Sequence, residues 1–366
     1  MRILEFITSL RLGGAERLVT DLALGFKEEG HDVVVALLDG TRTSFHDELE
    51  AKGVRIISLA EGAGSMRNPF LGIRLVRLLG KERYDVIHTH NSACQFLAAF
   101  ASLFLKLRLV TTEHNTSNRR RSWAWFKPLD RWMYSRYSRI ICVGDEVRRN
   151  LEEYLGDTVA GKTVIIRNGV DLDRFRNAVP DPGISSLPGY KVVMVAAFRP
   201  QKDQATLIRA MSLLQSDYQL FLVGGVEWPE DQPNLDSCKA LVRELGLESR
   251  VHFLGKRGDV PSILAASDVL VLSTHHEGMS LSVIEGMASG RPFVASDVAG
   301  VRDMVGVVEA LFPESDADAL AGLVRRSCED MTFRSWLSGM CLQRASGFDF
   351  KVMIKNYLEE YTKVCY

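Results

Sequence analysis

The sequence predicts an α/β protein with two doubly wound, Rossmann-like domains, each a parallel sheet covered by helices. Three observations support this fold class. The chain has 366 residues, which is enough for two domains of ordinary size. Short apolar runs alternate with longer segments of helical period, as expected for parallel strands joined by crossover helices. A break rich in proline and glycine near the middle divides this alternation into two series.

Strands are predicted at the short apolar runs, and helices where apolar residues recur at the helical period. The strands of the first series are Arg2–Ile7, Asp32–Leu37, Val54–Ile57, Val86–His88, Leu109–Thr112 and Ile140–Val143. Those of the second series are Val192–Ala197, Gln219–Val223, Val251–Phe253, Val269–Leu272 and Pro292–Ala295. The helices between them include Ala15–Lys27, Leu71–Leu79, Ala205–Leu214, Cys238–Leu245 and Ala317–Cys328.

The domain boundary is predicted within "NGVDLDRFRNAVPDPGISSLPGYK", which holds three prolines and three glycines. We therefore expect a first domain at 1–169, a linker at 170–190 and a second domain at 191–346. In open parallel sheets, ligands bind beyond the carboxyl ends of the strands. With two such sheets, we expect the site in a cleft between the domains.

The composition argues against several classes of protein. Lys+Arg (45) and Asp+Glu (46) nearly balance, so the overall charge does not attract nucleic acid. The longest apolar run, Phe96–Leu105, is too short to cross a bilayer. Glu5 interrupts the N-terminal apolar run, which predicts a strand rather than a signal peptide. The six cysteines lack metal-binding spacing and are expected as reduced core thiols, so the sequence indicates a cytoplasmic enzyme.

The stretch "HHEGMSLSVIEGMASGRPFVAS" (275–296) carries two glutamates, Glu277 and Glu285, beside a predicted helix start. A strand ends before Glu277, and a helix begins around Ser280 and ends at Gly290. The backbone N–H groups at such a helix start bind anions. One turn further on, the carboxylate of Glu285 can accept two hydrogen bonds from a sugar diol. The alternative is a glutamate that balances the helix dipole at 277 and a surface or salt-bridged glutamate at 285.

Two basic residues, Arg199 and Lys202, lie between a strand and the next helix in "VAAFRPQKDQATLIRAM". A helix N-terminus repels cations, so this pair is locally unfavourable unless an anion joins it. The pair therefore indicates a bound anion. The alternatives are a solvated turn, or an ion pair between Lys202 and Asp203.

Glycines and histidines mark the strand ends of the first domain. Gly13 and Gly14 in "LRLGGAERL" allow close approach of a ligand, although a plain strand-to-helix turn explains them too, and G-x-G-x-x-G is absent. His114 ends the strand in "TTEHN", where a purely structural role is the alternative. His88 and His90 are expected as structural rather than functional residues.

Several segments together resemble one known family. "EGMSLSVIE" resembles the Glu-x7-Glu motif of retaining, nucleotide-sugar-dependent glycosyltransferases of family four. The resemblance extends, in the same order along the chain, through "LRLGGAERL", "DVIHTHN", "TTEHN", "VIIRNGVDLDRF", "FRPQKD" and "HFLG". It implies the GT-B fold, in which two Rossmann-like domains face each other and a C-terminal helix, here about 347–366, packs back on the first domain.

The resemblance also implies roles for individual residues. Arg199 and Lys202 hold the donor diphosphate and stabilise the charge of the leaving group, Glu277 orients the sugar, and His114 contacts it. The implied catalytic residues are His114, Glu277, Arg199 and Lys202. The implied donor-binding residues are Gly13, Gly14, Arg199, Lys202, Glu277, Gly278, Met279, Ser280, Leu281 and Glu285. No metal and no other cofactor is expected, so we discount the acidic triplets at 171–173 and 316–318.

The segment 106–139 carries nine Lys/Arg residues against two acidic residues, and three of the five tryptophans. Basic residues interleaved with aromatic residues suit an anionic membrane surface or a lipid diphosphate. A solvated helix face and RNA binding are the alternatives. We expect peripheral association with the inner face of the membrane, and no nucleic-acid partner.

The resulting hypothesis is a retaining hexosyltransferase. It would use a nucleotide-diphosphate sugar, with UDP preferred as the nucleotide, and a glycan or polyprenyl-diphosphate-linked glycan acceptor of polysaccharide biosynthesis. Two alternatives stay open: a nucleotide-sugar epimerase of the same architecture, and a catalytically inactive partner subunit of a membrane glycosyltransferase.

Overall fold

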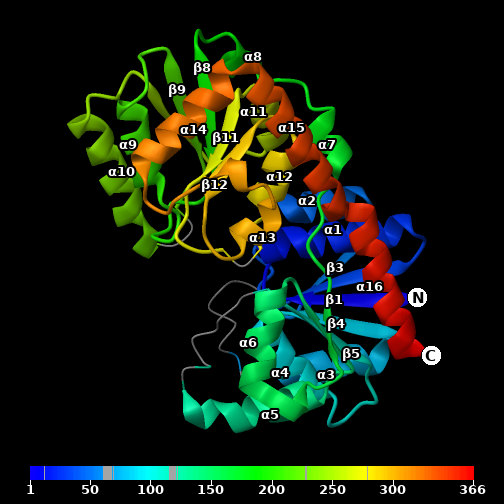
Figure 1. The fold of residues 1–366 in the computed structure, drawn as a ribbon. Helices are drawn as coiled ribbons and strands as arrows, with labels where there is room; N and C mark the ends of the chain where they lie inside the picture. The colour runs from blue at the N-terminus through cyan, green and yellow to red at the C-terminus, as the bar shows by residue number, and fades with distance from the viewer. Residues whose placement is uncertain are drawn as a thin grey trace. The chain divides into compact units, whose positions relative to one another are not determined.

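The computed structural model describes residues 1–11, 13–60, 68, 70–114, 121, 123–226, 229–277 and 279–366. It divides into two compact units, one of Met1–Asn168 with Lys351–Tyr366 and the other of Gly169–Phe350. Each unit is a parallel sheet with helices on both faces (Figure 1). The predicted fold class, two doubly wound α/β domains, is therefore confirmed.

The first unit contains a seven-stranded sheet in the order β3-β2-β1-β4-β5-β6-β7. The order reverses between β1 and β4, which are neighbours with Glu5 opposite His88. Loops at the carboxyl ends of two such central strands form the usual ligand site of a doubly wound sheet. The strands are β1 (Arg2–Ile7), β2 (Asp32–Leu37), β3 (Arg55–Ser58), β4 (Val86–His90), β5 (Leu109–Glu113), β6 (Arg139–Cys142) and β7 (Thr163–Ile165).

The second unit contains a six-stranded sheet in the order β10-β9-β8-β11-β12-β13. Its order reverses between β8 and β11, so its candidate site lies beyond the ends of those two strands. The strands are β8 (Tyr190–Val195), β9 (Tyr218–Val223), β10 (Val251–Gly255), β11 (Val269–Leu272), β12 (Phe293–Ser296) and β13 (Leu311–Phe312).

Helices join successive strands in both units, and α14, α15 and α16 follow the last strand. In the first unit they are α1 (Gly14–Glu28), α2 (Ser44–Ala51), α3 (Leu71–Lys81), α4 (Ser92–Ala101), α5 (Lys127–Ser135), α6 (Asp145–Leu155) and α16 (Phe350–Cys365). In the second they are α7 (Leu172–Arg176), α8 (Pro182–Ser185), α9 (Gln204–Ser212), α10 (Gln232–Glu244), α11 (Val260–Ala265), α12 (Leu281–Ala288), α13 (Val301–Val305), α14 (Ala317–Glu329) and α15 (Met331–Ala345). None of the helices in the described ranges combines the length and the apolar composition that a bilayer crossing requires.

The predicted strands and helices are present, with ends that differ by a few residues. Two short strands were not predicted: β7 has three residues and β13 has two, too few to show a period. The segment expected as a linker carries α7 and α8 and groups with the second unit. In α7, the side chain of Asp171 caps the helix by accepting from the N–H groups of Asp173 and Arg174.

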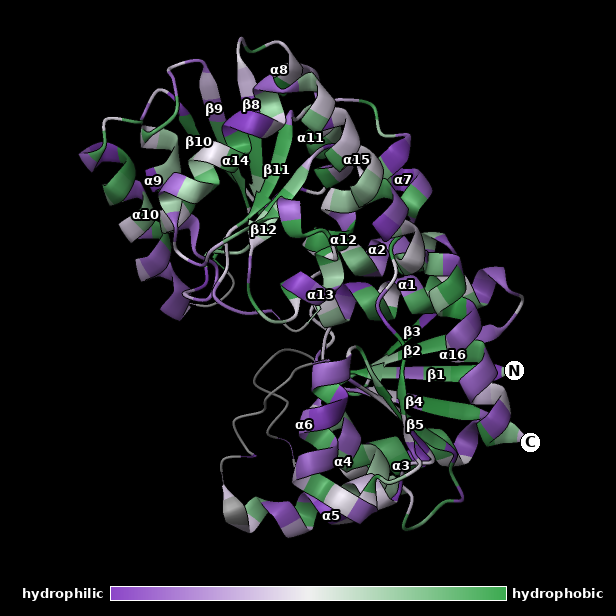
Figure 2. Ribbon diagram, viewed as in Figure 1, coloured by the Kyte–Doolittle hydropathy of each residue, from purple (hydrophilic) through white to green (hydrophobic). Residues whose placement is uncertain are grey.

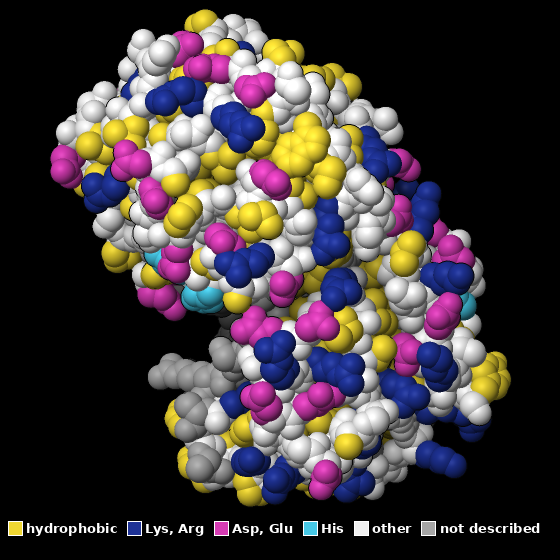
Figure 3. All heavy atoms as spheres, viewed as in Figure 1, with side chains coloured by type: hydrophobic (Ala, Val, Ile, Leu, Met, Phe, Trp, Pro, Cys, Tyr) yellow, Lys and Arg dark blue, Asp and Glu magenta, His cyan; other side chains and the backbone are white. Residues whose placement is uncertain are grey.

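The inner strands of both sheets are largely buried, and most of their residues are hydrophobic, as Figure 2 shows, whereas the edge strands β3, β7 and β10 are partly exposed. Lys/Arg and Asp/Glu side chains alternate over the surface seen in Figure 3, in keeping with the balanced overall charge. Acidic and histidine side chains interrupt the core of the first sheet, among them Glu113 on β5. Glu5, His88 and His90 are fully buried on adjacent strands.

Helix α16 packs on the first unit, and its end places the C-terminus of the chain near the N-terminus (Figure 1). The sulfur of Cys365 lies 3.7 Å from the backbone oxygen of Asp85. Two buried tyrosines of α16, Tyr357 and Tyr361, point their hydroxyls at residues of the central strands. The helix therefore supplies polar groups to the interior of the first unit as well as apolar ones.

Candidate functional site

Arg199, Lys202 and Glu277 lie in the two loops that follow the central strands of the second sheet. Arg199 and Lys202 follow β8, and Glu277 follows β11. These strands flank the point where the strand order reverses, so the sequence-predicted residues meet at the expected end of this sheet. A short antiparallel bridge between Lys202 and Thr274 joins the two loops.

The ammonium of Lys202 and the carboxylate of Glu277 form an ion pair. The same carboxylate oxygen accepts a hydrogen bond from the Thr274 hydroxyl at 3.1 Å. The side chains of Lys202 and Glu277 are only 12% and 8% exposed. Since partial burial strengthens electrostatic interactions, this pair presents a fixed charge arrangement beside the strand ends.

The expected alternative partner of Lys202, Asp203, is engaged elsewhere. Its carboxylate caps α9 by accepting from the N–H of Thr206 at 3.1 Å. The alternative of an ion pair between Lys202 and Asp203 is therefore not found, and Lys202 pairs with Glu277 instead. The Nε of Arg199 lies 4.0 Å from a carboxylate oxygen of Asp231, which immediately precedes α10.

Helix α12 begins where the sequence predicted. Ser280 is its N-cap residue, Leu281 its first helical residue, and Gly290 follows its end with a φ of 72°. The Ser280 hydroxyl contacts that of Ser282 at 2.9 Å and makes no side-chain cap, so it leaves the first backbone N–H groups of the helix to other acceptors. Such a helix start favours an anion.

Met279, Glu285 and Gly278 are the remaining residues that were predicted to bind the donor in this loop and helix. Met279 is partly buried, and so is Glu285 in the second turn of α12. A partly buried carboxylate keeps some contact with water, which lowers its desolvation cost. Gly278, also predicted to bind the donor, lies outside the described residues.

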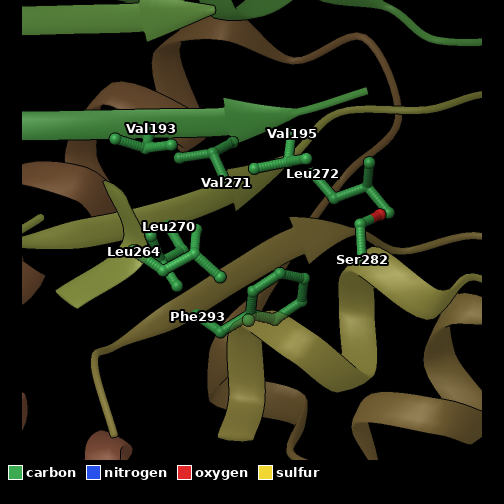
Figure 4. Close-up of a pocket in the computed structure, with 9 residues that line it drawn as sticks. Val193, Val195, Leu264, Leu270, Val271, Leu272, Ser282 and Phe293 are labelled. Atoms are coloured by element: carbon green, nitrogen blue, oxygen red, sulfur yellow. The ribbon is translucent and has the colours of Figure 1, made fainter. Parts of the chain in front are cut away.

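Close packing fixes α12 against its sheet. A Cβ at Gly286 would overlap the ring of Phe293, which is 2% exposed on β12. Beside this contact lies a small cavity of about 10 Å³, and Figure 4 draws the residues that line it. It is lined by apolar side chains and Ser282, so it is a packing defect beneath α12 rather than a place for a polar ligand.

In the first unit, Gly13 and Gly14 lie between β1 and α1. Gly13 is the N-cap residue in an extended conformation, and Gly14 begins the helix. A Cβ at Gly14 would meet no atom within 4 Å, so packing does not require glycine at this position. At Gly13, by contrast, a Cβ would overlap the carboxylate of Glu16, so this helix start already faces an acidic side chain.

A chain of hydrogen bonds connects His114 to the core of the first sheet. Its Nε2 lies 3.1 Å from Nδ1 of His90. Nε2 of His90 lies 2.7 Å from the carboxylate of Glu5. His88 lies beside the same carboxylate, with 3.0 Å between its Nδ1 and Glu5 Oε2.

The shifts in pKa follow from this burial and pairing. Burial alone would raise the pKa of Glu5, but the charge and hydrogen bond of His88 and the hydrogen bond of His90 lower it to about 2. Burial, followed by the charge of His88, lowers the pKa of His90 to about 4. Burial and the charges of His90 and His88 hold the pKa of His114 well below its usual range. At neutral pH, Glu5 is therefore a carboxylate while His90 and His114 are neutral.

Glu5, Thr112 and Tyr361, for which the sequence predicted no function, all belong to this network. The Tyr361 hydroxyl lies 3.1 Å from Glu5 and 2.6 Å from His88, and Thr112 lies 2.8 Å from the other nitrogen of His88. Two signals were available: an acidic residue inside an apolar strand, and two histidines spaced by two in "VIHTH". No local pattern indicates that α16 supplies Tyr361.

The basic and aromatic segment 106–139 divides into buried and exposed parts. Tyr134 and Tyr137 belong to the core, and Arg121 pairs with Glu113 at 2.8 Å, so these residues are not available to a surface partner. Trp123 and Trp125 are 45% and 69% exposed, and their rings stack with 5.7 Å between centroids. Exposed basic residues nearby in the sequence are Lys106, Arg108, Arg131 and Arg136.

The acidic triplets at 171–173 and 316–318, which we discounted as metal ligands, each contain a helix-capping aspartate. Asp171 caps α7, and Asp316 caps α14 by accepting from the N–H of Ala319 at 2.8 Å. A carboxylate that caps a helix already directs an oxygen at backbone donors.

Comparison with known proteins identifies the family. The model of the family "Glycosyltransferase Family 4" matches residues 12–174, and the model of "Glycosyl transferases group 1" matches residues 189–330. The two matches together cover most of both units. The chain thus belongs to the family 4, group 1 glycosyltransferases, and it is a glycosyltransferase.

Curated relatives are glycosyltransferases of lipid-linked and polysaccharide substrates. UDP-Gal:alpha-D-GlcNAc-diphosphoundecaprenol alpha-1,3-galactosyltransferase of Escherichia coli is 31% identical over 251 residues, 64% of this chain and 63% of that protein. The match thus spans less than two thirds of that relative. Phosphatidyl-myo-inositol mannosyltransferase of Mycolicibacterium smegmatis is 25% identical over 96% of this chain and 90% of its own length.

Solved structures share the whole fold. Anabaena HepE in complex with UDP-glucose superimposes with a TM-score of 0.84 at 23% identity, over 99% of this chain and 100% of that one. WaaG, a glycosyltransferase involved in lipopolysaccharide biosynthesis, gives a TM-score of 0.72 at 16% identity, over 98% and 99% of the two chains. The architecture is therefore the GT-B fold.

Proposed function

We propose that this glycosyltransferase transfers a hexose from a UDP-sugar, with retention of configuration, to a lipid-linked or surface-polysaccharide acceptor. The observation that carries the proposal is the ion pair of Lys202 and Glu277, beside the start of α12, at the strand-order reversal of the second sheet. One relative named for UDP-galactose and the HepE complex with UDP-glucose support the choice of UDP.

In the proposed mechanism, the second unit binds the donor nucleotide. The backbone N–H groups at Ser280 and Leu281 bind a phosphate oxygen, and Glu285 accepts hydrogen bonds from the ribose hydroxyls. Arg199 and Lys202 stabilise the negative charge that grows on the departing diphosphate. Glu277 holds Lys202 in place and orients the sugar.

The first unit contributes Gly13, Gly14 and His114. A phosphate or a sugar hydroxyl would approach the backbone at Gly13 and Gly14, where it would displace the Glu16 carboxylate from the start of α1. His114 contacts the donor sugar near its reacting carbon.

The proposed chemical step is a displacement on one face of the sugar. The bond from the anomeric carbon to the UDP oxygen breaks as the bond to the acceptor oxygen forms. The acceptor's hydroxyl proton passes to the leaving diphosphate, so UDP departs with that proton. No metal is assigned to this step, because basic side chains and helix N-termini can neutralise the diphosphate.

The exposed Trp123 and Trp125 pair supports association with an anionic membrane, where a lipid-linked acceptor resides. Stacked, exposed tryptophans suit the interface between lipid headgroups and acyl chains, and nearby arginines attract anionic lipids. This surface also favours a lipid diphosphate among the possible acceptors.

The test is a donor and acceptor screen on the purified protein. UDP-glucose, UDP-galactose, GDP-mannose and ADP-glucose are each supplied with polyprenyl-diphosphate N-acetylglucosamine in vesicles. We expect UDP release and a new glycosidic linkage of the same anomeric configuration as the donor, determined by NMR. Conversion of the UDP-sugar to its epimer without transfer would favour the epimerase alternative, and no turnover of any donor would favour the inactive-subunit alternative.

A further inference from the structure

Three groups surround the buried carboxylate of Glu5, and each can donate a hydrogen bond to it. They are His88 Nδ1 at 3.0 Å from Oε2, His90 Nε2 at 2.7 Å from Oε2, and the Tyr361 hydroxyl at 3.1 Å from Oε1. A fully buried carboxylate is stable only when such donors replace its water. The carboxylate can only accept, so His90 must carry its proton on Nε2.

This assignment determines the next hydrogen bond. A neutral imidazole has one N–H, so His90 Nδ1 is a lone-pair acceptor once Nε2 is the donor. The atom facing Nδ1 is Nε2 of His114, at 3.1 Å, and it must therefore carry the proton. His114 is left with an unprotonated Nδ1.

We infer that Glu5 and His90 are positioning residues for His114, which they hold in the Nε2–H tautomer so that its Nδ1 accepts a hydrogen bond from a sugar hydroxyl. The inference rests on the proposed role of His114 toward the donor sugar. It specifies the direction of the hydrogen bond in that contact, because the group on the sugar must donate the proton to Nδ1. A hydroxyl satisfies this requirement, whereas the carboxylate of a uronic acid would meet a lone pair.

The same geometry could suggest a metal site, since Glu5, His88 and His90 offer ligand atoms within 4.8 Å of one another. The hydrogen-bond arrangement favours instead the chain of hydrogen bonds from Glu5 through His90 to His114, which we call the relay. His90 Nε2 and Glu5 lie at the distance of a charge-assisted hydrogen bond, and Tyr361 contacts both Glu5 and His88. These contacts satisfy the buried groups without an ion.

Tyr361 extends the relay to the C-terminal helix. Its hydroxyl and that of Tyr357, which lies 3.3 Å from Thr112, anchor α16 to the side chains that hold His88. The ring of Tyr361 also packs edge-on against Phe26. The orientation of His114 therefore depends on α16, which lies far from it in sequence.

The test uses the full-length protein labelled with ¹⁵N-histidine, without ligand, at pH 7.5. Two-bond ¹H–¹⁵N correlation spectra show which ring nitrogen carries the proton, and His90→Asn and His114→Asn identify the signals. We expect the Nε2–H pattern for His90 and for His114. An Nδ1–H or doubly protonated pattern for His114 would overturn the inference, whatever the protein does with a donor.

A variant then tests whether the relay serves the reaction. Glu5→Gln can donate to His90, so His114 should shift partly to the Nδ1–H tautomer. We expect kcat for UDP release from UDP-glucose to fall on the order of 10-fold, with KM changed less. His252→Asn, in the second unit, is the matched control and should leave the His114 signals unchanged.

The outcomes separate the relay from the proposed function. A tautomer shift without a change in kcat, while the wild type turns over UDP-glucose, would refute the positioning role. A wild type with the predicted tautomer but no turnover of any donor would refute the proposed function and leave the relay standing. If Glu5→Gln does not fold, the wild-type spectrum still decides the tautomer, and Tyr361→Phe replaces it as the variant that disturbs Glu5.

Discussion

Lys202 and Glu277 form an ion pair across 75 residues of sequence. Each comes from the loop beyond one of the two central strands of the second sheet, and the single Thr274 hydroxyl proton is shared between the backbone oxygen of Gln201 and the Glu277 carboxylate. The pair therefore joins the two loops at the place where a doubly wound sheet binds its ligand. It holds the ammonium in position before any donor arrives.

Replacement of Lys202 by methionine tests the electrostatic part of this arrangement. Methionine keeps the length of the side chain but removes the charge, and it leaves Glu277 without its cation. We expect kcat for UDP release to fall about 100-fold or more. Steady-state kinetics with UDP-glucose measures the change. Lys239→Met, at an exposed position of α10, should retain activity, and equal activity in both variants would contradict the role of Lys202.

The stability of the first unit should depend on pH through Glu5, His90 and His114. The pKa of His90 is about 4, below its usual value of 6.5, so the unfolded chain binds a proton first as the pH falls. Stability from this group is fully present above pH 6.5 and is lost as the pH falls toward 4. The lowered pKa of Glu5, about 2 against 4.5, acts in the same direction below pH 4.5.

Urea unfolding at a series of pH values from 7.5 to 4 measures this dependence. We expect a loss on the order of 3 kcal/mol from His90. His90→Asn should flatten the profile, whereas His276→Asn, at an exposed position, should not. The groups that contact His90 are Glu5, His88 and His114, and Tyr361 contacts Glu5 and His88 in turn. A profile that His90→Asn leaves unchanged would contradict the assignment.

Gly286 should tolerate no side chain. In Gly286→Ala, the new methyl group would collide with the buried Phe293 ring and push α12 away from its sheet. We expect a loss of about 1–3 kcal/mol of stability and weaker UDP binding. Gly322→Ala, in α14, is the matched control, because its Cβ meets nothing within 4 Å and should stabilise by roughly 0.5–1 kcal/mol. Thermal melts of both variants compare them, and equal melting temperatures would refute the packing argument.

The exposed tryptophans should mediate membrane binding. In Trp123→Ser/Trp125→Ser, sedimentation with phosphatidylglycerol vesicles should be at least about 10-fold weaker, because the aromatic anchor is lost. Binding by the wild type should also weaken in high salt. Trp336→Ser removes a comparably exposed tryptophan, 41% exposed, from the second unit and should bind as the wild type does. Unchanged binding by the double variant would contradict the proposed surface.

The sequence predicted the layered parts of the fold because each strand and helix satisfies a local rule. The run "DVLVLST" and the alternation before it indicate β11 without tertiary information, and Gly290 and Pro292 predict the end of α12. The two shortest strands could not be predicted, because two or three residues show no period. Their pairing depends on the neighbouring strand.

The candidate site was predictable only in part. Strand ends and a helix start indicated Arg199, Lys202 and Glu277, but not that Lys202 selects Glu277 over the adjacent Asp203. That choice depends on how the two loops fold together. The roles of Glu5 and Tyr361 were missed because their contacts join the two ends of the chain, 356 residues apart.

The most direct test of the account is calorimetric titration of UDP, GDP and ADP into the wild type and Glu285→Ala, with Glu244→Ala as an exposed control on α10. We expect UDP to bind the wild type and the control equally well, and to bind Glu285→Ala at least about 10-fold more weakly, a difference of about 1.4 kcal/mol. Circular dichroism establishes that each variant is folded. Undiminished binding by folded Glu285→Ala, or no binding of UDP by the wild type, would contradict the account.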